Sequence, residues 1–184
     1  PGRIKYKDLN GDKVVNSLDQ DWIGTYLPKL EYGLRVNLGY KSFDFSVFGS
    51  GVAGRKGVDA YIYYNNFVES RENAAPGTLD AWTASNKSSD IPAATIVDNN
   101  NEKRMSTYLL RNNSYFKLRS LQIGYNLPLD LVKKAGMSQL RVYFQGENMF
   151  WITPKGYIGS DPERTSIDRI PVPTSYSFGL SASF

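Results

Sequence analysis

The sequence contains no cysteine and no histidine. Disulfide bonds, thiolate or imidazole metal sites and nucleophile–histidine catalytic pairs are therefore excluded. No apolar run reaches the roughly 20 residues of a membrane-spanning helix. Lysine and arginine are scattered, and the net charge of +4 is mild, so the basic stripe that binds nucleic acid is missing. Only scattered carboxylates remain for catalysis, and we expect a protein that is not an enzyme.

The last ten residues, 175–184, alternate between two kinds of side chain. Serine or glycine occupies every second position, and the positions between are apolar: Tyr176, Phe178, Leu180, Ala182 and Phe184. This alternation predicts a strand whose two faces meet different surroundings. A soluble chain rarely ends on an ordered, half-apolar strand. An outer-membrane β-barrel needs such a closing strand, because no sheet edge can face lipid.

Four further segments show the same alternation: 30–40, 43–50, 115–125 and 140–147. The length of each segment is close to the roughly 9–11 residues that a tilted strand needs to cross a bilayer. Charged residues inside them, such as Arg35 and Asp44, fall on the polar face. Segment 115–125 changes phase halfway, and a β-bulge near Arg119-Ser120 would reconcile its two halves. Alternation by itself is also typical of a soluble β-sandwich.

The connections between the predicted strands are alternately short and long. Segments 40–43 and 126–138 are short, and the second holds a possible helical turn at 129–134. The long connections are 7–29, 51–113 and 151–174. This pattern is typical of a barrel with short periplasmic turns and long extracellular loops. Counting back from a final strand that ends in the periplasm puts all three long loops outside the cell. We therefore predict an all-β fold, an antiparallel transmembrane β-barrel.

Six motifs follow one another along the chain: Arg3-Ile-Lys-Tyr-Lys-Asp-Leu-Asn-Gly-Asp12, Ala81-Trp-Thr83, Asn113-Ser-Tyr-Phe-Lys-Leu-Arg-Ser-Leu-Gln-Ile-Gly-Tyr-Asn-Leu-Pro128, Leu140-Arg-Val-Tyr-Phe-Gln-Gly-Glu-Asn-Met-Phe150, Gly159-Ser-Asp-Pro-Glu163 and the terminal Phe184. Together they resemble the C-terminal end of SusC/RagA-type TonB-dependent outer-membrane transporters of Bacteroidetes. The resemblance implies that residues 1–184 are the C-terminal portion of a 22-stranded barrel. About six strands would be present, the first only by its end near residues 2–7, and the plug and earlier strands would be absent. Since the sequence opens on Pro1 without an initiator methionine, we expect a processed product or a fragment.

The resemblance also implies a function and partners. It implies a multi-pass importer of oligosaccharides or oligopeptides in the cell outer membrane. The expected partners are a SusD-like surface lipoprotein, the TonB complex acting through the missing plug, the remaining barrel strands and outer-membrane lipid. One alternative is siderophore uptake by the same type of barrel. Another is a secreted, calcium-stabilised β-sandwich that binds carbohydrate, which would be soluble without detergent.

Residues 8–19 predict a calcium-binding loop. Six residues would supply oxygen ligands at the spacing of a twelve-residue calcium loop: Asp8, Asn10, Asp12, Val14 through its carbonyl, Asn16 and Asp19. Calcium takes six or more such ligands at about 2.3–2.6 Å. Lys13 stands where glycine is usual, and Asp19 is shorter than the usual bidentate glutamate. The alternative is an ion-free loop of Asx turns.

Segment 51–113 contains the aromatic residues most suited to contact a ligand. Aromatic faces stack on sugar rings and apolar side chains. The candidates for a substrate or partner loop are Tyr61, Tyr63, Tyr64 and Trp82. The alternative is that they pack the loop onto itself. Asp161 and Glu163 are neighbouring acids, but Pro162 between them favours a structural turn over general acid–base chemistry.

Overall fold

The computed structural model describes residues 1–67, 73–97, 99–157, 161–164 and 170–184. Its contacts divide the chain into two compact units. Of the described residues, unit 1 contains 1–26 and 56–111. Unit 2 contains 27–55, 112–157, 161–164 and 170–184. The five segments with alternating sequence all fall in unit 2.

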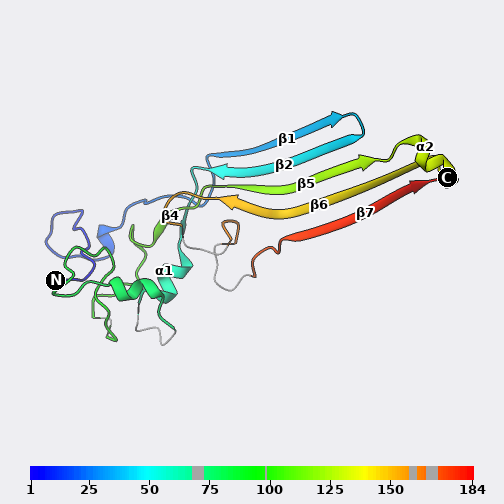
Figure 1. Cartoon of the computed structure of the whole chain (residues 1–184). Helices are drawn as coiled ribbons and strands as arrows, with labels where there is room; N and C mark the ends of the chain where they lie inside the picture. Colours follow the sequence, from blue (N-terminus) through cyan, green and yellow to red (C-terminus); the bar gives the residue numbers. More distant parts are fainter. Residues whose placement is uncertain (68–72, 98, 158–160, 165–169) are drawn as a thin grey trace. The chain divides into compact units, whose positions relative to one another are not determined.

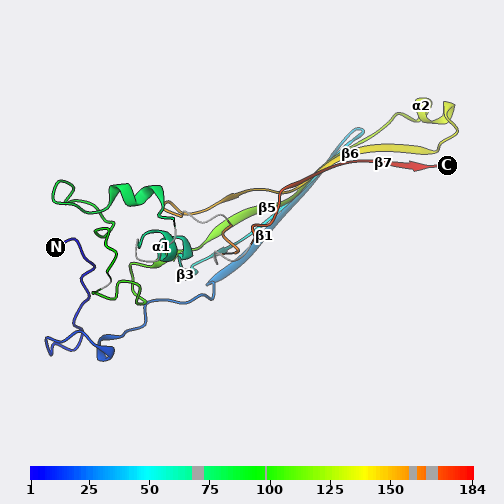
Figure 2. The ribbon, with the colours of Figure 1, turned by 90° about the horizontal axis from the view of Figure 1, so that it is seen from below.

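Unit 2 is built on one five-stranded antiparallel sheet (Figure 1). Its strands, in spatial order, are β1 (Leu30–Tyr40), β2 (Phe43–Ala53), β5 (Tyr115–Asn126), β6 (Gln139–Ile152) and β7 (Ser175–Ser183). Figure 2 views the sheet close to its edge and shows that it twists along its length, as antiparallel sheets do. Within the described residues β1 and β7 are edge strands, so the sheet is not closed.

The pairing register places most apolar residues of the five strands on one face. Tyr40 pairs with Phe43, which pairs with Tyr125, and the row continues through Val142 to Leu180. A second apolar row consists of Leu38, Phe45, Ile123, Phe144 and Phe178. The row between these two faces the other way and consists of Gly39, Asp44, Gly124, Tyr143 and Gly179. The two-faced strands expected from the alternation are confirmed.

A β-bulge at Arg119 keeps both halves of β5 in phase with the sheet. Phe48 pairs with Ser120, whereas the next residue, Gly49, pairs with Leu118, so Arg119 is left without a partner on β2. The register with β6 shifts at the same place. Because the extra residue shifts the alternation by one position, the apolar residues before and after it share a face. The bulge expected near Arg119-Ser120 is confirmed.

The two short connections of the sheet also match the expectation. Lys41-Ser42 joins β1 to β2, and the segment between β5 and β6 holds the helix α2 (Leu129–Lys134). Val132 is buried and anchors α2. Gly136 follows the helix with a φ of 72°, the left-handed conformation in which glycine ends helices readily. Both short connections lie at the end of the sheet that carries the C-terminus (Figure 1).

Unit 1 is mostly irregular but has a small core of its own. Its elements are η1 (Ser17–Asp19), β3 (Lys56–Val58), α1 (Ala60–Asn65), η3 (Pro76–Asp80) and most of β4 (Leu110–Asn112), which pairs with β3. Ile62, Phe67 and Leu109 form the buried cluster. Most of the long connection 51–113 is therefore a folded insertion. None of the helices in the described ranges is long and apolar enough to cross a membrane.

Residues 2–7, which we expected to form the end of a first strand, do not form one. The Gly2 carbonyl accepts a hydrogen bond from the Ala93 amide at 2.7 Å. The Ile4 amide donates to the Glu102 carboxylate at 2.9 Å. These backbone groups thus bond to segment 93–102 of unit 1 rather than to a neighbouring strand. The sheet accordingly has five strands where about six were expected.

Candidate functional site: the polar face of the sheet

Side chains on the polar face of the sheet are joined across several strands. Arg141 on β6 donates to the two carboxylate oxygens of Asp44 on β2 at 3.0 and 2.6 Å. The two residues reach each other across β5 because Gly124 lies between them, where a Cβ would collide with both charged groups. Ser46 donates to Asn37 at 2.7 Å and links β2 to β1. The face is therefore a connected polar surface rather than a set of isolated solvated charges.

Towards the other end of the strands, segment 161–164 is bound to β5 by an ionic cluster. The Lys117 Nζ lies 3.3 Å from Asp161 Oδ2 and 3.2 Å from Glu163 Oε2. The side chains of Lys117 and Asp161 are fully buried. Arg119, the bulged residue, donates to both oxygens of Glu163 at 2.6 and 2.5 Å. The bulge thus adds a second cation beside the buried lysine.

Further hydrogen-bond donors complete the cluster. The Tyr115 hydroxyl donates to Glu163 Oε1 at 2.9 Å. The Asp161 carboxylate accepts from the Glu163 and Val172 backbone amides at 2.9 and 3.1 Å. Arg55 donates to the Pro162 carbonyl at 2.5 Å. A buried charge must be paired and hydrogen-bonded to be stable. These contacts supply both, and they hold segment 161–164 through its side chains as well as its backbone.

The charge state of Glu163 follows from these contacts. The Arg119 guanidinium, and after it the donors of Tyr115 and Lys117, lowers the pKa of the Glu163 carboxyl to about 2 against the opposing effect of its burial. Glu163 is therefore ionised at any pH near neutrality. The cluster is an ion-paired attachment and not a proton donor.

A pit of about 440 Å³ opens on the polar face beside this cluster. Its lining includes Glu31, Phe48, Ser50, Val52, Tyr115 and Arg119. The Arg119 Nε donates to the Ser50 hydroxyl at 2.9 Å, which fixes that wall. The guanidinium of Arg35 lies 5.1 Å from the centre of the Phe48 ring. The pit combines an aromatic wall with charged groups at its margin.

The sequence predicted a structural turn that contains Asp161 and Glu163, but it did not indicate which residues bind them. Lys117 and Arg119 are 44 to 46 residues away along the chain, a separation that no local pattern bridges. One signal was available, since two basic residues stand close together in a strand with an otherwise alternating pattern. Gly159 and Ser160, the first two residues of the same motif, lie outside the described residues.

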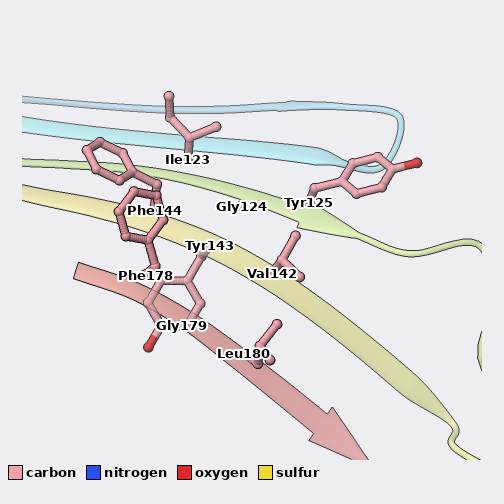
Figure 3. A pocket seen from close by; sticks show the side chains of 9 residues that line it. All are labelled: Ile123, Gly124, Tyr125, Val142, Tyr143, Phe144, Phe178, Gly179 and Leu180. Carbon is pink, nitrogen blue, oxygen red and sulfur yellow. The ribbon is translucent and has the colours of Figure 1, made fainter. Parts of the chain in front are cut away.

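The opposite face of the sheet is apolar and exposed. A concavity of about 650 Å³ lies on β5, β6 and β7, and the rings of Phe144 and Phe178 in its lining are 5.1 Å apart. Figure 3 shows the lining side chains. Phe178 is 83% and Leu180 73% exposed. A β-sandwich would need a second sheet over this face. The other sheet in the described residues has two strands of three residues each, too small for that task.

The proposed calcium ligands lie in one compact loop. The Asp8 carboxylate accepts hydrogen bonds from two loop amides at 2.6 and 2.8 Å. Asp19 closes the loop by accepting from the Leu9 and Asn16 amides at 2.7 and 2.8 Å. The hydrogen bond from the Asn16 amide is the main reason why the pKa of Asp19 is lowered. Lys13 adopts a φ of 70°, the conformation for which calcium loops usually carry glycine.

Within residues 8–19 the carboxylates of Asp8 and Asp19 are thus held by amides of the loop itself, which both the calcium loop and the ion-free loop of Asx turns allow. The described part of the chain contains no group of three or more aspartate, glutamate, histidine or cysteine residues placed to hold a metal ion. A site here would depend on Asn10, Asn16 and the Val14 carbonyl as much as on the acids. Calcium binding stays a prediction.

The aromatic candidates lie in unit 1 and pack within it. Tyr61, Tyr63 and Tyr64 lie on α1. Tyr63 packs on the buried cluster, and its ring lies 5.0 Å from that of Tyr64 in an edge-to-face arrangement. The Trp82 indole lies against Gly2. These contacts account for the packing of Tyr63, Tyr64 and Trp82. Contact of the four residues with a substrate or partner stays a prediction.

Relatives are found by comparison of whole sequences, although no family model matches the chain. TonB-dependent receptor P3 of Formosa agariphila is 31% identical over 166 residues, which cover 89% of this chain and 16% of the relative. TonB-dependent receptor P26 of the same organism is 28% identical over 195 residues, which cover 100% of this chain and 20% of the relative. The chain thus spans about one fifth or less of the curated relatives that it matches.

A solved structure shows the same fold. The RagAB peptide importer in the closed-closed state superposes with a TM-score of 0.75 and 26% identity, covering 100% of this chain and 20% of that chain. The similarity therefore extends over the whole length of this chain. The chain belongs to the TonB-dependent receptor family, in its SusC/RagA-like branch.

Proposed function

We propose that this chain forms part of the barrel wall and the extracellular loops of a TonB-dependent outer-membrane importer of oligosaccharides or oligopeptides. The observation that carries the proposal is the exposure of the two faces of the sheet. A lysine is buried on the polar face, while Phe178 and Leu180 are exposed on the apolar face. In a membrane barrel the apolar face meets lipid and the polar face lines the lumen.

The open edges of the sheet support a larger barrel. Since no unpaired sheet edge can face lipid, β1 and β7 would each pair with a further strand, in a barrel of about 22 strands with a plugged lumen. The long connections would lie outside the cell and the short ones in the periplasm. Energy would come from the TonB complex acting on a plug that is not part of this sequence.

The cargo and the partner follow from the likeness to a peptide importer. The similarity to the RagAB peptide importer supports peptide cargo and a SusD-like surface lipoprotein as the second component. The long connections of this chain would offer the surface on which that lipoprotein closes. Tyr61, Tyr63, Tyr64 and Trp82 are the side chains that we assign to this loop surface.

We also assign a structural calcium ion to the loop 8–19. Extracellular calcium is plentiful enough to fill even a weak site. Ion binding would protect the segment from proteolysis in calcium relative to EDTA, and the double substitution Asp8→Ala and Asp12→Ala should remove that difference. Equal protection in the two conditions for the unaltered receptor would rule the ion out.

The transport proposal is tested by measuring which face of the sheet is accessible to water and which to lipid. Cysteine is absent from this sequence, so single cysteines can be placed at Val36 on the apolar face and at Asn37 beside it on the polar face. In native outer membranes, a water-soluble maleimide should label Asn37→Cys, and only a lipid-soluble reagent should label Val36→Cys. Equal labelling of both by the water-soluble reagent, or recovery of the intact receptor without detergent, would refute a barrel wall. Loss of peptide uptake on deletion of the receptor then tests the cargo.

A further inference from the structure

Two charges of opposite sign stand on the polar face of β1 at the margin of the pit. Glu31 and Arg35 are both exposed. They are four residues apart on one strand, which corresponds to about 13 Å. In the ranges that the structure describes, neither side chain has an ion-pair or hydrogen-bond partner. The Arg35 guanidinium lies over the Phe48 ring and remains open to a further ligand.

The surface between these two charges is low and of mixed polarity. Gly33 lies midway between them and pairs with Ser50 on β2. The Phe48 ring is already 3.4 Å from where a Cβ of Gly33 would be, so a side chain there would fill the pit. The floor therefore offers a hydroxyl group and an aromatic ring below an open space. An extended ligand lying along β1 would pass over this floor from Glu31 to Arg35.

The other charged groups around the pit already have partners. Arg119 is paired at two points with Glu163. Lys117 lies between Glu163 and Asp161. Because these four groups neutralise one another, Glu31 in the lining of the pit and Arg35 above its Phe48 ring are, among the described residues there, the acid and the base available to bind ionic groups from solution. The geometry calls for a ligand with a cation at one end and an anion at the other.

We propose that the pit binds the backbone of a short oligopeptide with free ends, its amino group on Glu31 and its carboxylate on Arg35. An extended peptide covers about 3.3–3.6 Å per residue, so about four residues match the separation. A guanidinium binds a carboxylate at two points, and Phe48 and Tyr115 offer contact for apolar side chains. A neutral oligosaccharide would leave both charges unmatched. This inference rests on the proposed importer function and specifies its cargo as zwitterionic.

The test uses the intact purified receptor and four forms of one tetrapeptide: free, N-acetylated, C-amidated, and blocked at both ends. Affinity for the free peptide should fall about three- to tenfold in Glu31→Gln, while affinity for the acetylated form stays unchanged. Arg35→Gln should weaken the free and acetylated forms but not the amidated one. Each substitution should thus leave unchanged the affinity for the peptide in which the matching end group is blocked.

Glu147→Gln is the matched control. Glu147 lies in the same row of the polar face as Arg35, three strands away and outside the pit, so its loss should change none of the affinities. Equal losses for free and blocked peptides in Glu31→Gln, or affinities that ignore the end groups in the unaltered receptor, would overturn the site. In that case peptide uptake would persist. Failure of the importer proposal would instead remove uptake of every peptide and expose Val36→Cys to the water-soluble label.

Discussion

The two faces of the five-stranded sheet reverse the burial of a soluble protein. On the polar face the side chains of Lys117 and Asp161 are fully buried, whereas on the apolar face Phe178 is 83% exposed. Soluble domains bury phenylalanine, and they fully bury lysine or aspartate only as paired groups. Here the paired charges are buried while the aromatic ring is exposed, which is the arrangement that the proposed lumen on the polar side requires. On the polar side, ion pairs and hydrogen bonds stabilise the structure as apolar packing does in the core of a soluble protein.

Both faces depend on a single register. A shift of one residue along a strand exchanges its two faces, so the polar network and the apolar surface are gained or lost together. The strand in which this dependence is most visible is β5, because its two halves share a face only through the bulge at Arg119.

Deletion of Arg119 should have the largest effect. Without the extra residue, one half of β5 would turn its apolar side chains to the lumen and its polar side chains to lipid. We expect no folded receptor in the outer membrane, measured by heat-modifiable migration in electrophoresis. Arg119→Ala is the control, because it keeps the residue count while it removes the ion pair with Glu163. A folded deletion variant would show that the bulge does not set the phase.

Lys117→Met should have the next largest effect. It would leave the buried Asp161 carboxylate with its amide donors but without its cation, a change that costs about 3–5 kcal/mol in buried pairs. The loss should be local, seen as faster hydrogen exchange of residues 161–164. The double variant Lys117→Met with Asp161→Asn should recover part of it, since the uncompensated charge is gone. No recovery would mean that the lysine acts by packing and not by charge.

The difference between the faces also explains what the sequence could predict. Alternation depends on neighbours two residues apart, so the five strands, both short turns, α2 and the bulge could all be predicted. The ends of the strands shifted by a few residues, because pairing continued into segments such as 51–53 where glycine and small residues hide the pattern. Residues 2–7 alternate as well, but their backbone bonds to Glu102 and Ala93 instead of to a strand.

The candidate site was harder to predict because its members come from distant parts of the chain. Asp161 and Glu163 read as a turn, and Lys117 reads as one more polar residue of a strand. Only the fold shows that they meet, 44 and 46 residues apart. The pit could not be predicted for the same reason. Only the pairing register of β1 with β2 shows that Gly33, Phe48 and the two charges of β1 lie next to one another.

Two adjacent substitutions on β2 should separate the faces directly. Val47 lies on the apolar face and pairs with Val36 and Leu121, while Ser46 beside it lies on the polar face. Val47→Arg should destabilise the folded receptor by about 2–4 kcal/mol, the cost of an arginine facing lipid near the middle of a bilayer. Ser46→Arg should change stability little. Urea unfolding in lipid vesicles measures both, and similar losses for the two variants would contradict the assignment of the faces.

The smallest effect is expected from pH, because near neutrality it is zero. Glu163 has a pKa lowered to about 2, chiefly by Arg119. A lowered folded-state pKa means that the stabilisation is fully present above the ordinary pKa of about 4.5 and is lost as pH falls towards about 2. Hydrogen-exchange protection of residues 170–174, corrected for intrinsic rates, should therefore be constant above about pH 5 and decrease below it. Glu163→Gln should lower protection at neutral pH and flatten the acid dependence. A decrease of equal size in that variant would show that Glu163 is not the group whose protonation weakens the cluster.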